Sequence, residues 1–344
     1  MPVEYSGIND EHITVREKVG VFDVSHMGEF WIKGPKAAGF LQYITTNDIN
    51  SLYDGKVHYS CMPNGRGGIK DDLLVYRVDP ETYMIVVNAA NIEKDWDWCC
   101  YHAPKFGLEV GTELCNASDE FALLAVQGPY AFKVMQKLID VPIDKMKFYT
   151  FKKLDIGGVK NAIFSTTGYT GSGGYEIYVN NDDGPALWKS VFEAGEEFGI
   201  KPAGLGARDT LRLETGLCLY GNDIDETTSP IEAGLQWIVK FTDNNEFIDR
   251  EFLLKQKMEG PERRLVGFVM HERGIPRTNY EITDEEGSII GHVTSGTMSP
   301  MMKTGIGLGY VRSAYAKNGT GIKILVRNKS ISAEVAGLPL FKKQ

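Results

Sequence analysis

The sequence predicts an α+β fold that ends in a small antiparallel β-domain, either a barrel or a sandwich. Segments rich in aromatic and β-branched residues, which are typical of strands, are mixed with helical segments without strict β-α-β alternation. From Arg264 onward, short strand-like runs are separated by turn signals. The apolar fraction of 42% and the charged fraction of 24% are those of ordinary globular proteins.

In chain order, predicted strands and helices follow one another without a regular pattern between residues 30 and 198. Strands are predicted at residues 30–34, 73–76, 83–87, 121–126 and 175–179. One helix is predicted over Ile92–Trp98, and another after Gly128-Pro129 because proline suits a first helical turn. A third is predicted over Ala186–Phe198, where apolar residues recur at helical spacing.

The chain of 344 residues is long enough for two or three domains. The character of the sequence changes between about residues 240 and 262, where the charged segment Asp243–Lys257 is predicted to be one more helix. Turn signals follow at 286–287, 317–319 and 327–329. We therefore assign residues 1–245 to a first region and residues 246–344 to a C-terminal β-domain with a leading helix.

Charge and composition exclude several classes of protein. The net charge of −9 and the pI of about 5.3 argue against a nucleic-acid partner, although a local basic cluster could still hold an anionic ligand. No apolar run is long enough to span a membrane, and the first residues lack the pattern of a signal peptide, so we expect a cytoplasmic protein. The five cysteines include no C-x-x-C pair, which argues against a zinc ribbon and favours reduced, buried thiols.

Acidic residues in apolar strands are the first candidates for chemistry. Asp71 and Asp72 open a strand that is otherwise apolar, and because neighbouring strand residues point to opposite faces, one can face a pocket. From these residues alone, a turn with both acids in water is the preferred interpretation. Glu176 also lies in an apolar strand, where a carboxylate could accept two parallel N–H bonds from a heterocycle.

Two further segments allow more than one interpretation. Asp23, Ser25 and His26 suggest a hydrolase, but their spacing does not fit a nucleophile elbow, which leaves a binding-site wall or a plain turn. Asn88, at a strand end, could bind a planar heterocycle, and Asn91 is predicted to cap the next helix.

Glycine-rich and charged segments follow. The loop from Gly168 to Gly174 lacks the ending of a phosphate-binding loop, so a tight turn between strands is the plain interpretation. Charged residues between Arg208 and Glu214 recur at helical spacing. For Arg212 and Glu214, an exposed helix with ion pairs is the preferred interpretation.

Taken together and in order, these segments resemble the T-protein of the glycine cleavage system. The resemblance covers nearly the whole chain and is carried by FDVSHMGEF, GGIKDDLLVY, VVNAANIEKD, LAVQGP, GYTGSGGYE, GLGARDTLRLETGLCLYGNDID, SPIEAGL and TSGTMSP. It implies the T-protein fold, with a two-lobed, discontinuous folate-binding region followed by a C-terminal β-barrel-like domain. The family usually begins with a segment leading into a W-x-M-P stretch, whereas this chain begins at Met1-Pro2.

The resemblance also implies an activity. An aminomethyltransferase of this family passes a one-carbon unit from the dihydrolipoyl arm of H-protein to tetrahydrofolate, releasing ammonia and 5,10-methylenetetrahydrofolate. The partner is lipoylated H-protein, bound transiently, and no metal is implied. Asp72 matches the family's catalytic carboxylate and Glu176 the acid that grips the pterin's amino edge. The other matched pocket positions are Met27, Tyr59, Asn88, Tyr169 and Arg208, with Phe148 at a position where the family has a tyrosine.

Two departures and several alternatives accompany this interpretation. Ser172-Gly173 replaces the Glu-Asp found in many members, so a looser loop is expected, and Phe148 keeps ring stacking but lacks a hydroxyl. A non-catalytic folate-binding relative, of the kind active in iron–sulfur protein maintenance, is the main alternative. Relatives that demethylate sarcosine carry a flavin domain with G-x-G-x-x-G, which this sequence lacks. A pure interaction module is the third alternative.

Overall fold

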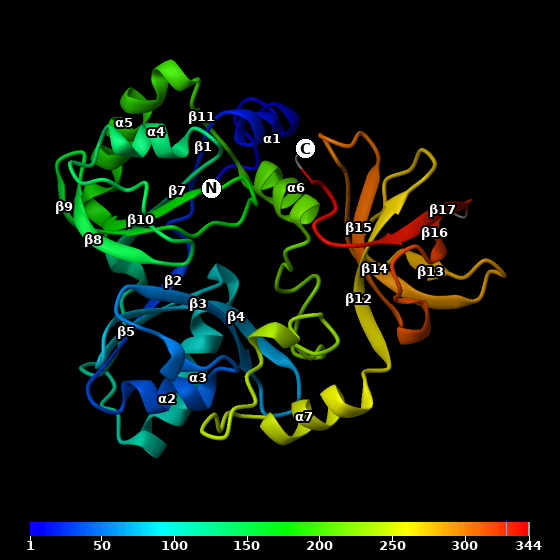
Figure 1. The fold of residues 1–344 in the computed structure, drawn as a ribbon, viewed down its shortest axis with the longest axis horizontal. Helices are drawn as coiled ribbons and strands as arrows, with labels where there is room; N and C mark the ends of the chain where they lie inside the picture. Colours follow the sequence, from blue (N-terminus) through cyan, green and yellow to red (C-terminus); the bar gives the residue numbers. More distant parts are fainter. Residues whose placement is uncertain (328, 343–344) are drawn as a thin grey trace. The chain divides into compact units, whose positions relative to one another are not determined.

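The computed structural model describes residues 1–327 and 329–342, which form two compact units (Figure 1). The first unit contains residues 1–63, 70–207 and 240–248. The second contains residues 64–69, 208–239 and the chain from Asp249 onward. Helix α6 (Leu205–Thr215) runs from the first unit into the second.

A five-stranded sheet forms one half of the first unit. Its strands, in spatial order, are β3 (Lys56–Pro63), β4 (Ile69–Asp79), β5 (Thr82–Val87), β2 (Gly28–Lys33) and β6 (Leu114–Asn116). Helices α2 (Ala37–Ile44) and α3 (Ile92–Phe106) cover one face. Alternate residues such as Phe30, Ile32, Leu73 and Val75 are buried against these helices, as period-two strands require.

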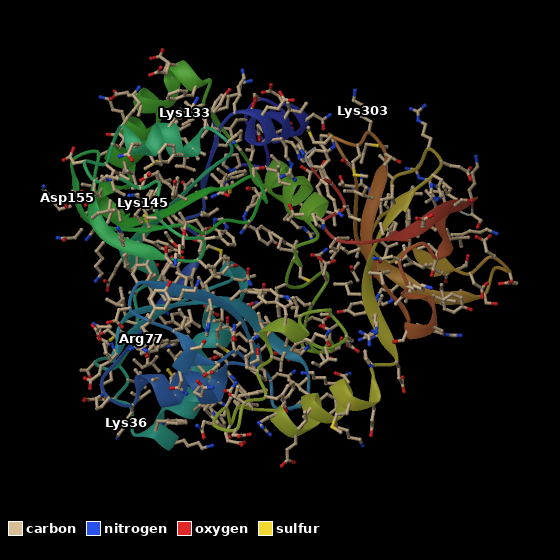
Figure 2. All side chains as sticks on the ribbon, in the orientation of Figure 1. Lys36, Arg77, Lys133, Lys145, Asp155 and Lys303 are labelled. Atoms are coloured by element: carbon tan, nitrogen blue, oxygen red, sulfur yellow. The ribbon has the colours of Figure 1, made fainter. Side chains whose placement is uncertain are left out.

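A six-stranded sheet forms the other half of this unit. Its strands, in spatial order, are β11 (Lys201–Pro202), β1 (Gly20–Asp23), β7 (Phe121–Gln127), β10 (Gly174–Asn180), β9 (Val159–Ser165) and β8 (Phe151–Ile156). Helices α4 (Ala131–Gln136) and α5 (Gly184–Gly195) pack on it, and α1 (Ile8–Glu17) lies beside β1 and β11. Charged side chains such as Lys133 and Asp155 point outward from this half (Figure 2).

The faces of the two sheets that no helix covers contact each other through aromatic side chains. The rings of Tyr76 on β4 and Tyr178 on β10 lie 5.6 Å apart, and those of Trp31 on β2 and Phe121 on β7 lie 6.4 Å apart. Residues of β4 and β10 that do not enter the two helix-covered cores therefore face the space between the sheets. Asp72 and Glu176 lie on these inner faces.

The second unit is built on a closed barrel. Its strands, in spatial order, are β12 (Arg263–Met270), β15 (Gly305–Arg312), β14 (Ile289–Met298), β13 (Glu281–Thr283), β16 (Gly321–Val326) and β17 (Lys329–Ala336). Helix α7 (Arg250–Glu259) leads into β12. Buried side chains including Phe268, Ile282, Val293 and Ile324 fill the barrel, which closes the sheet edges.

This architecture confirms the α+β fold with a C-terminal antiparallel barrel. The helix predicted over 243–257 begins only at Arg250, because Lys240–Ile248 pairs with the first unit and leaves turns before it. The predicted turn at 327–329 includes Asn328, which lies outside the described residues. Every helix in residues 1–327 and 329–342 is too short or too polar to cross a membrane.

The cysteines differ in part from the prediction of buried thiols. Cys61, Cys99 and Cys218 are buried and reduced, as expected. Cys100 and Cys115 are also free thiols, but they are partly exposed, because α3 presents Cys100 at the edge of the core and β6 is an edge strand.

Candidate active site

Asp71 and Asp72 do not form the solvent-exposed turn that the residues alone favoured. They lie within β4, on opposite faces of the strand. Asp71 is completely buried on the side of the helix-covered core, and Asp72 is half-buried on the side that faces the second sheet. Local sequence could not decide this, because the side that each acid faces depends on which segments cover the strand.

The Asp72 carboxylate is held by one hydrogen bond to each oxygen. The hydroxyl of Tyr59, on β3, donates to Oδ2 over 2.8 Å, and Nδ2 of Asn88 donates to Oδ1 over 2.8 Å. Burial, together with the negative charge of Asp71, raises the pKa of Asp72 to about 7, although both hydrogen bonds favour the charged form. A carboxyl group whose charge changes near neutral pH is suited to chemistry.

Asn88 and Asn91 hold the neighbouring acid. Asn88 donates to Asp71 from its backbone N–H over 2.9 Å and from Nδ2 over 2.8 Å. Asn91 occupies the N-cap position of α3, as predicted, but its side chain makes no capping bond there. It donates instead to Oδ1 of Asp71 over 2.6 Å. The buried carboxylate thus receives the donors that a buried charge needs.

The opposite wall is formed by β10 and the strand end before it. The hydroxyl of Thr167 donates to Oε2 of Glu176, which is half-buried. Thr167 is linked in turn to Tyr76 across 3.3 Å, and the hydroxyls of Tyr76 and Tyr178 lie 3.0 Å apart. Tyr76 comes from the five-stranded sheet, so this chain of hydroxyls ties the two walls together.

Tyr149 is a site residue that the sequence did not reveal. Its phenol is close enough to both acids that burial and the charges of Glu176 and Asp72 raise its pKa to about 12. Its backbone has a φ of 60°, a conformation that is costly for a bulky residue and that concentrates at functional sites. Hydrogen bonds from its N–H to the carbonyl of Thr166 and from the N–H of Val57 to its own carbonyl hold it there.

The prediction of Phe148 as a pocket residue does not fit this geometry. The side chain of Phe148 is 70% exposed, and its ring contacts that of Tyr149 at a centroid distance of 4.6 Å. Because the backbone at Tyr149 is left-handed, the side chains of Phe148 and Tyr149 point in different directions. A comparison of sequences does not show which of the two neighbours enters the pocket.

Several hydrogen bonds hold the loop that carries Tyr169. Gln127 donates from Nε2 to the carbonyl of Thr167 over 3.2 Å. The buried Arg16, on α1, donates to the carbonyl of Thr170 over 2.6 Å and to the hydroxyl of Ser172 over 2.8 Å. A side chain at Gly168 would overlap the Gln127 amide. Tyr169 itself is half-buried within this fixed loop.

The turn that precedes β2 carries Met27 and the Asp-Ser-His segment. The carboxylate of Asp23 accepts from the backbone N–H and the hydroxyl of Ser25, and the Ser25 hydroxyl accepts from the N–H of Leu123. These bonds make a structural turn, and His26 is exposed. Met27 is half-buried at the end of the turn, where its N–H donates to the carbonyl of Val24.

Glu29, two residues further on, is a buried acid with no compensating bond. It is 1% exposed, and neither carboxyl oxygen has a hydrogen-bond partner among the described residues. Burial raises the pKa of Glu29 to about 8. Its charge also raises the pKa of Tyr178, so it lies near the hydroxyl chain between the sheets.

Arg208 lies on α6 in the second unit and is partly buried there. The prediction that Arg212 and Glu214 are exposed is wrong: Arg212 is 1% exposed and Glu214 is completely buried. Arg212 pairs with Asp223 and donates to the hydroxyl of Ser295 over 2.8 Å. The barrel strand that covers this face of the helix is far away in sequence, so helical spacing alone could not show the burial.

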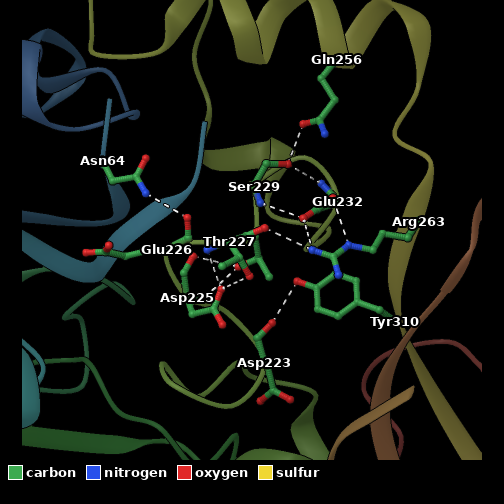
Figure 3. Close-up of polar contacts among 11 residues, drawn as sticks. Asn64, Asp223, Asp225, Glu226, Thr227, Ser229, Glu232, Gln256, Arg263 and Tyr310 are labelled. Carbon is green, nitrogen blue, oxygen red and sulfur yellow. Dashed lines mark hydrogen bonds and ion pairs between the residues drawn. The ribbon is translucent and has the colours of Figure 1, made fainter. Parts of the chain in front are cut away.

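A polar network fixes the segment from Asp223 to Glu232 within the second unit (Figure 3). Arg263 pairs with Glu232 over 3.0 Å and lies over the ring of Tyr310, whose hydroxyl donates to the carbonyl of Asp223 over 2.9 Å. Ser229 donates to Gln256 over 2.6 Å. Within SPIEAGL, Glu232 therefore anchors the segment to β12 and Ser229 anchors it to α7, while Asp223 anchors it to β15.

The first unit thus presents two acids and three polar side chains from two facing sheets: Asp72, Glu176, Tyr59, Asn88 and Tyr149. Acceptor oxygens on both walls suit a planar ligand that carries N–H donors and develops positive charge. In the described residues, no group of three or more His, Cys, Asp or Glu side chains is arranged to hold a metal ion.

Comparisons with known proteins agree with this arrangement. Residues 1–243 match the GCVT N-terminal domain, and residues 263–342 match the glycine cleavage T-protein C-terminal barrel domain. The chain is 59% identical to the aminomethyltransferase of Bacteroides thetaiotaomicron and 51% identical to that of Halothermothrix orenii, in each case over 99% of this chain and 93% of the relative. The crystal structure of glycine cleavage system aminomethyltransferase T from Bartonella henselae superposes with a TM-score of 0.90 at 34% identity, covering 99% of this chain and 91% of that one.

Proposed function

The chain belongs to the glycine cleavage T-protein family and is an aminomethyltransferase, and we propose that it uses Asp72 to pass the one-carbon unit to tetrahydrofolate. The observation that carries this proposal is the position of Asp72. Its carboxylate is half-buried, is held by Tyr59 and Asn88, and faces a second wall that carries Glu176. The names of the relatives favour the enzyme over a non-catalytic folate-binding relative.

The chemistry of the two walls fits tetrahydrofolate. The pterin has an amino-pyrimidinone edge with adjacent N–H donors, which a carboxylate accepts well. Glu176, kept in position by Thr167, is the acceptor that we assign to this edge. Tyr149 and Tyr169 would flank the ring, and Met27 would lie at its margin. We keep Arg208 as a predicted contact to the folate.

Asp72 would act on the reacting nitrogens through charge. When the carbon–sulfur bond to the carrier or the carbon–nitrogen bond to ammonia breaks, the one-carbon unit becomes a cationic iminium. A fixed carboxylate close to that cation lowers its free energy, and the hydrogen bonds from Tyr59 and Asn88 fix it before the reaction. The ionised form is the one that stabilises a cation, so activity should rise as pH increases through the pKa of Asp72.

The donor that we propose is the aminomethylated dihydrolipoyl arm of H-protein. The carbon leaves sulfur and nitrogen and ends bonded to N5 and N10 of the folate. Two hydrogens from these folate nitrogens, together with those of the amine, complete one ammonia and one thiol, so no oxidant or reductant is needed. A carrier that shuttles between enzymes is expected to dock weakly and with strong dependence on ionic strength.

The test is to follow the carbon itself. H-protein carrying a carbon-13 aminomethyl group is mixed with the chain, with and without tetrahydrofolate. The proposal expects the label in methylenetetrahydrofolate and a matching release of ammonia, both dependent on added folate. Folate binding without transfer of the label would instead support the non-catalytic alternative.

A further inference from the structure

A second pair of acids lies behind Asp72, inside the core covered by α2 and α3. Asp71, on β4, and Asp95, on α3, are both completely buried. Asp71 accepts N–H bonds from the backbone and side chain of Asn88 and from the side chain of Asn91. Its oxygens thus receive three N–H donors, which is what a buried carboxyl group needs to be satisfied.

Asp95 has the opposite environment. Neither of its carboxyl oxygens receives a bond from an N–H or hydroxyl of the described residues. Asp95 lies one helical turn after Asn91, whose side chain donates to Asp71, so α3 presents Asp95 on the same side of the helix as that contact. Burial, and then the charge of Asp71, raises the pKa of Asp95 to about 11, although Lys94 and Lys70 act in the other direction. If Asp71 and Asp95 were both ionised, their negative charges would repel each other and neither could donate a hydrogen bond to the other. The contact between them becomes favourable only when one of the two acids holds a proton.

The pair is connected to the site through one amide group. Nδ2 of Asn88 donates to Oδ1 of Asp71 and to Oδ1 of Asp72, in each case over 2.8 Å, and to the carbonyl of Asp72 over 3.0 Å. Asp71 offers only acceptors to Asn88, so it determines which end of that amide points towards the two acids. The orientation of Asn88 in turn fixes one oxygen of Asp72.

We propose that Asp95 holds a proton for Asp71, and that this one-proton pair positions Asn88 and thereby the Asp72 carboxylate. The proposal rests on the role assigned to Asp72 above. Asp71 and Asp95 are positioning residues, since neither reaches the inner face of the sheet where the substrate would lie. The charge of Asp71 also acts on Asp72, together with the hydrogen bonds from Tyr59 and Asn88. From the opposite wall, Tyr149 is close enough to feel the charges of both Asp72 and Glu176.

Three substitutions separate the parts of this arrangement. Asp95→Asn keeps a donor towards Asp71, so kcat should stay within about threefold of the wild type. Asp95→Ala removes the donor, and kcat should fall by about tenfold or more, because a displaced catalytic group is costly.

Asp71→Asn removes the charge, so the acidic limb of the kcat/KM profile should move down by about half a pH unit or more. Asp97→Asn, on the exposed side of α3, is the matched control and should change nothing.

The proton itself can be observed independently of activity. At about pH 9 the infrared spectrum of the wild type should contain a protonated-carboxyl band that Asp95→Asn lacks. This measurement remains informative if Asp95→Ala fails to fold. The absence of the band in the wild type would overturn the proposal. It would also be overturned if Asp95→Ala and Asp71→Asn both kept the wild-type kcat and the wild-type pH dependence of kcat/KM. Full turnover by Asp72→Asn would instead overturn the proposed role of Asp72.

Discussion

The hydroxyl of Tyr59 donates a hydrogen bond of 2.8 Å to Oδ2 of Asp72. This bond favours the carboxylate form and so opposes the burial and the charge of Asp71 that raise the pKa of Asp72 to about 7. The two residues come from neighbouring strands, β3 and β4, and the bond therefore depends on the register of the sheet. It gives the site a charged group at neutral pH that would otherwise be more often protonated.

Tyr59→Phe should shift the acidic limb of the pH profile upward. Without the phenol the carboxylate loses a donor, so the pKa of Asp72 rises and less of the active form is present at pH 7. We expect the pKa to rise by about one pH unit, so that kcat/KM at pH 7 falls by about fivefold and recovers above pH 8. Tyr53→Phe is the control, because Tyr53 is 53% exposed. An equal loss at every pH would contradict this account.

Tyr149→Phe and Phe148→Ala should have unequal effects. Tyr149 lies near both Asp72 and Glu176, whereas Phe148 is 70% exposed. Loss of a hydroxyl from a position close to both acids should weaken tetrahydrofolate binding by about tenfold or more, while Phe148→Ala should change it by less than about threefold. Calorimetric titration with tetrahydrofolate measures both. A larger effect of Phe148→Ala would restore that residue as the pocket aromatic.

Glu29→Gln should stabilise the protein at alkaline pH. The pKa of Glu29 is about 8 in the fold and 4.5 for an ordinary glutamate, so the fold prefers the neutral acid. In the wild type, the contribution of Glu29 to the free energy of unfolding is therefore fully present below pH 4.5. It is lost progressively as the pH rises to 8, by at most ~1.4 kcal/mol per pH unit.

Melting temperatures measured from pH 5 to pH 9 test the Glu29 prediction. The gain of Glu29→Gln over the wild type should widen with pH and level off above pH 8. Glu193→Gln, at a side chain that is 66% exposed, should show no such trend. A gain that is constant across this range would mean that Glu29 does not titrate as a buried acid.

Asp223→Asn should destabilise the second unit far more than Asp209→Asn. Both acids contact Arg212, but Asp223 is completely buried, whereas the Asp209 side chain is 49% exposed. Breaking a buried pair should cost about 3–5 kcal/mol, and breaking an exposed one about 0–1 kcal/mol. Urea unfolding followed by circular dichroism provides the comparison. Equal losses would show that Arg212 does not depend on its buried partner.

The sequence predicted the elements whose signals are local. Richness in apolar, aromatic and β-branched residues placed the strands around Leu73 and Ile177, and turn signals every few residues placed the barrel. The position of Asn91 at the start of α3 was also predictable, because asparagine at a strand-to-helix junction is a common N-cap.

What the sequence could not predict depends on contacts between distant segments. The burial of Asp71 follows from the packing of α2 and α3 on β4, and the burial of Arg212 follows from contact with β14. Tyr149 enters the site because of a left-handed backbone turn held by Val57 and Thr166. No pattern in the sequence around residue 149 indicates that conformation.

The most direct test of the central claim compares wild type and Asp72→Asn in a single turnover with aminomethylated H-protein and saturating tetrahydrofolate. The account predicts that Asp72→Asn remains folded and binds tetrahydrofolate, but forms methylenetetrahydrofolate at least about a hundredfold more slowly, since a charge that stabilises the transition state is lost. Formation of methylenetetrahydrofolate at the wild-type rate by Asp72→Asn would contradict the role of this carboxylate in the transfer.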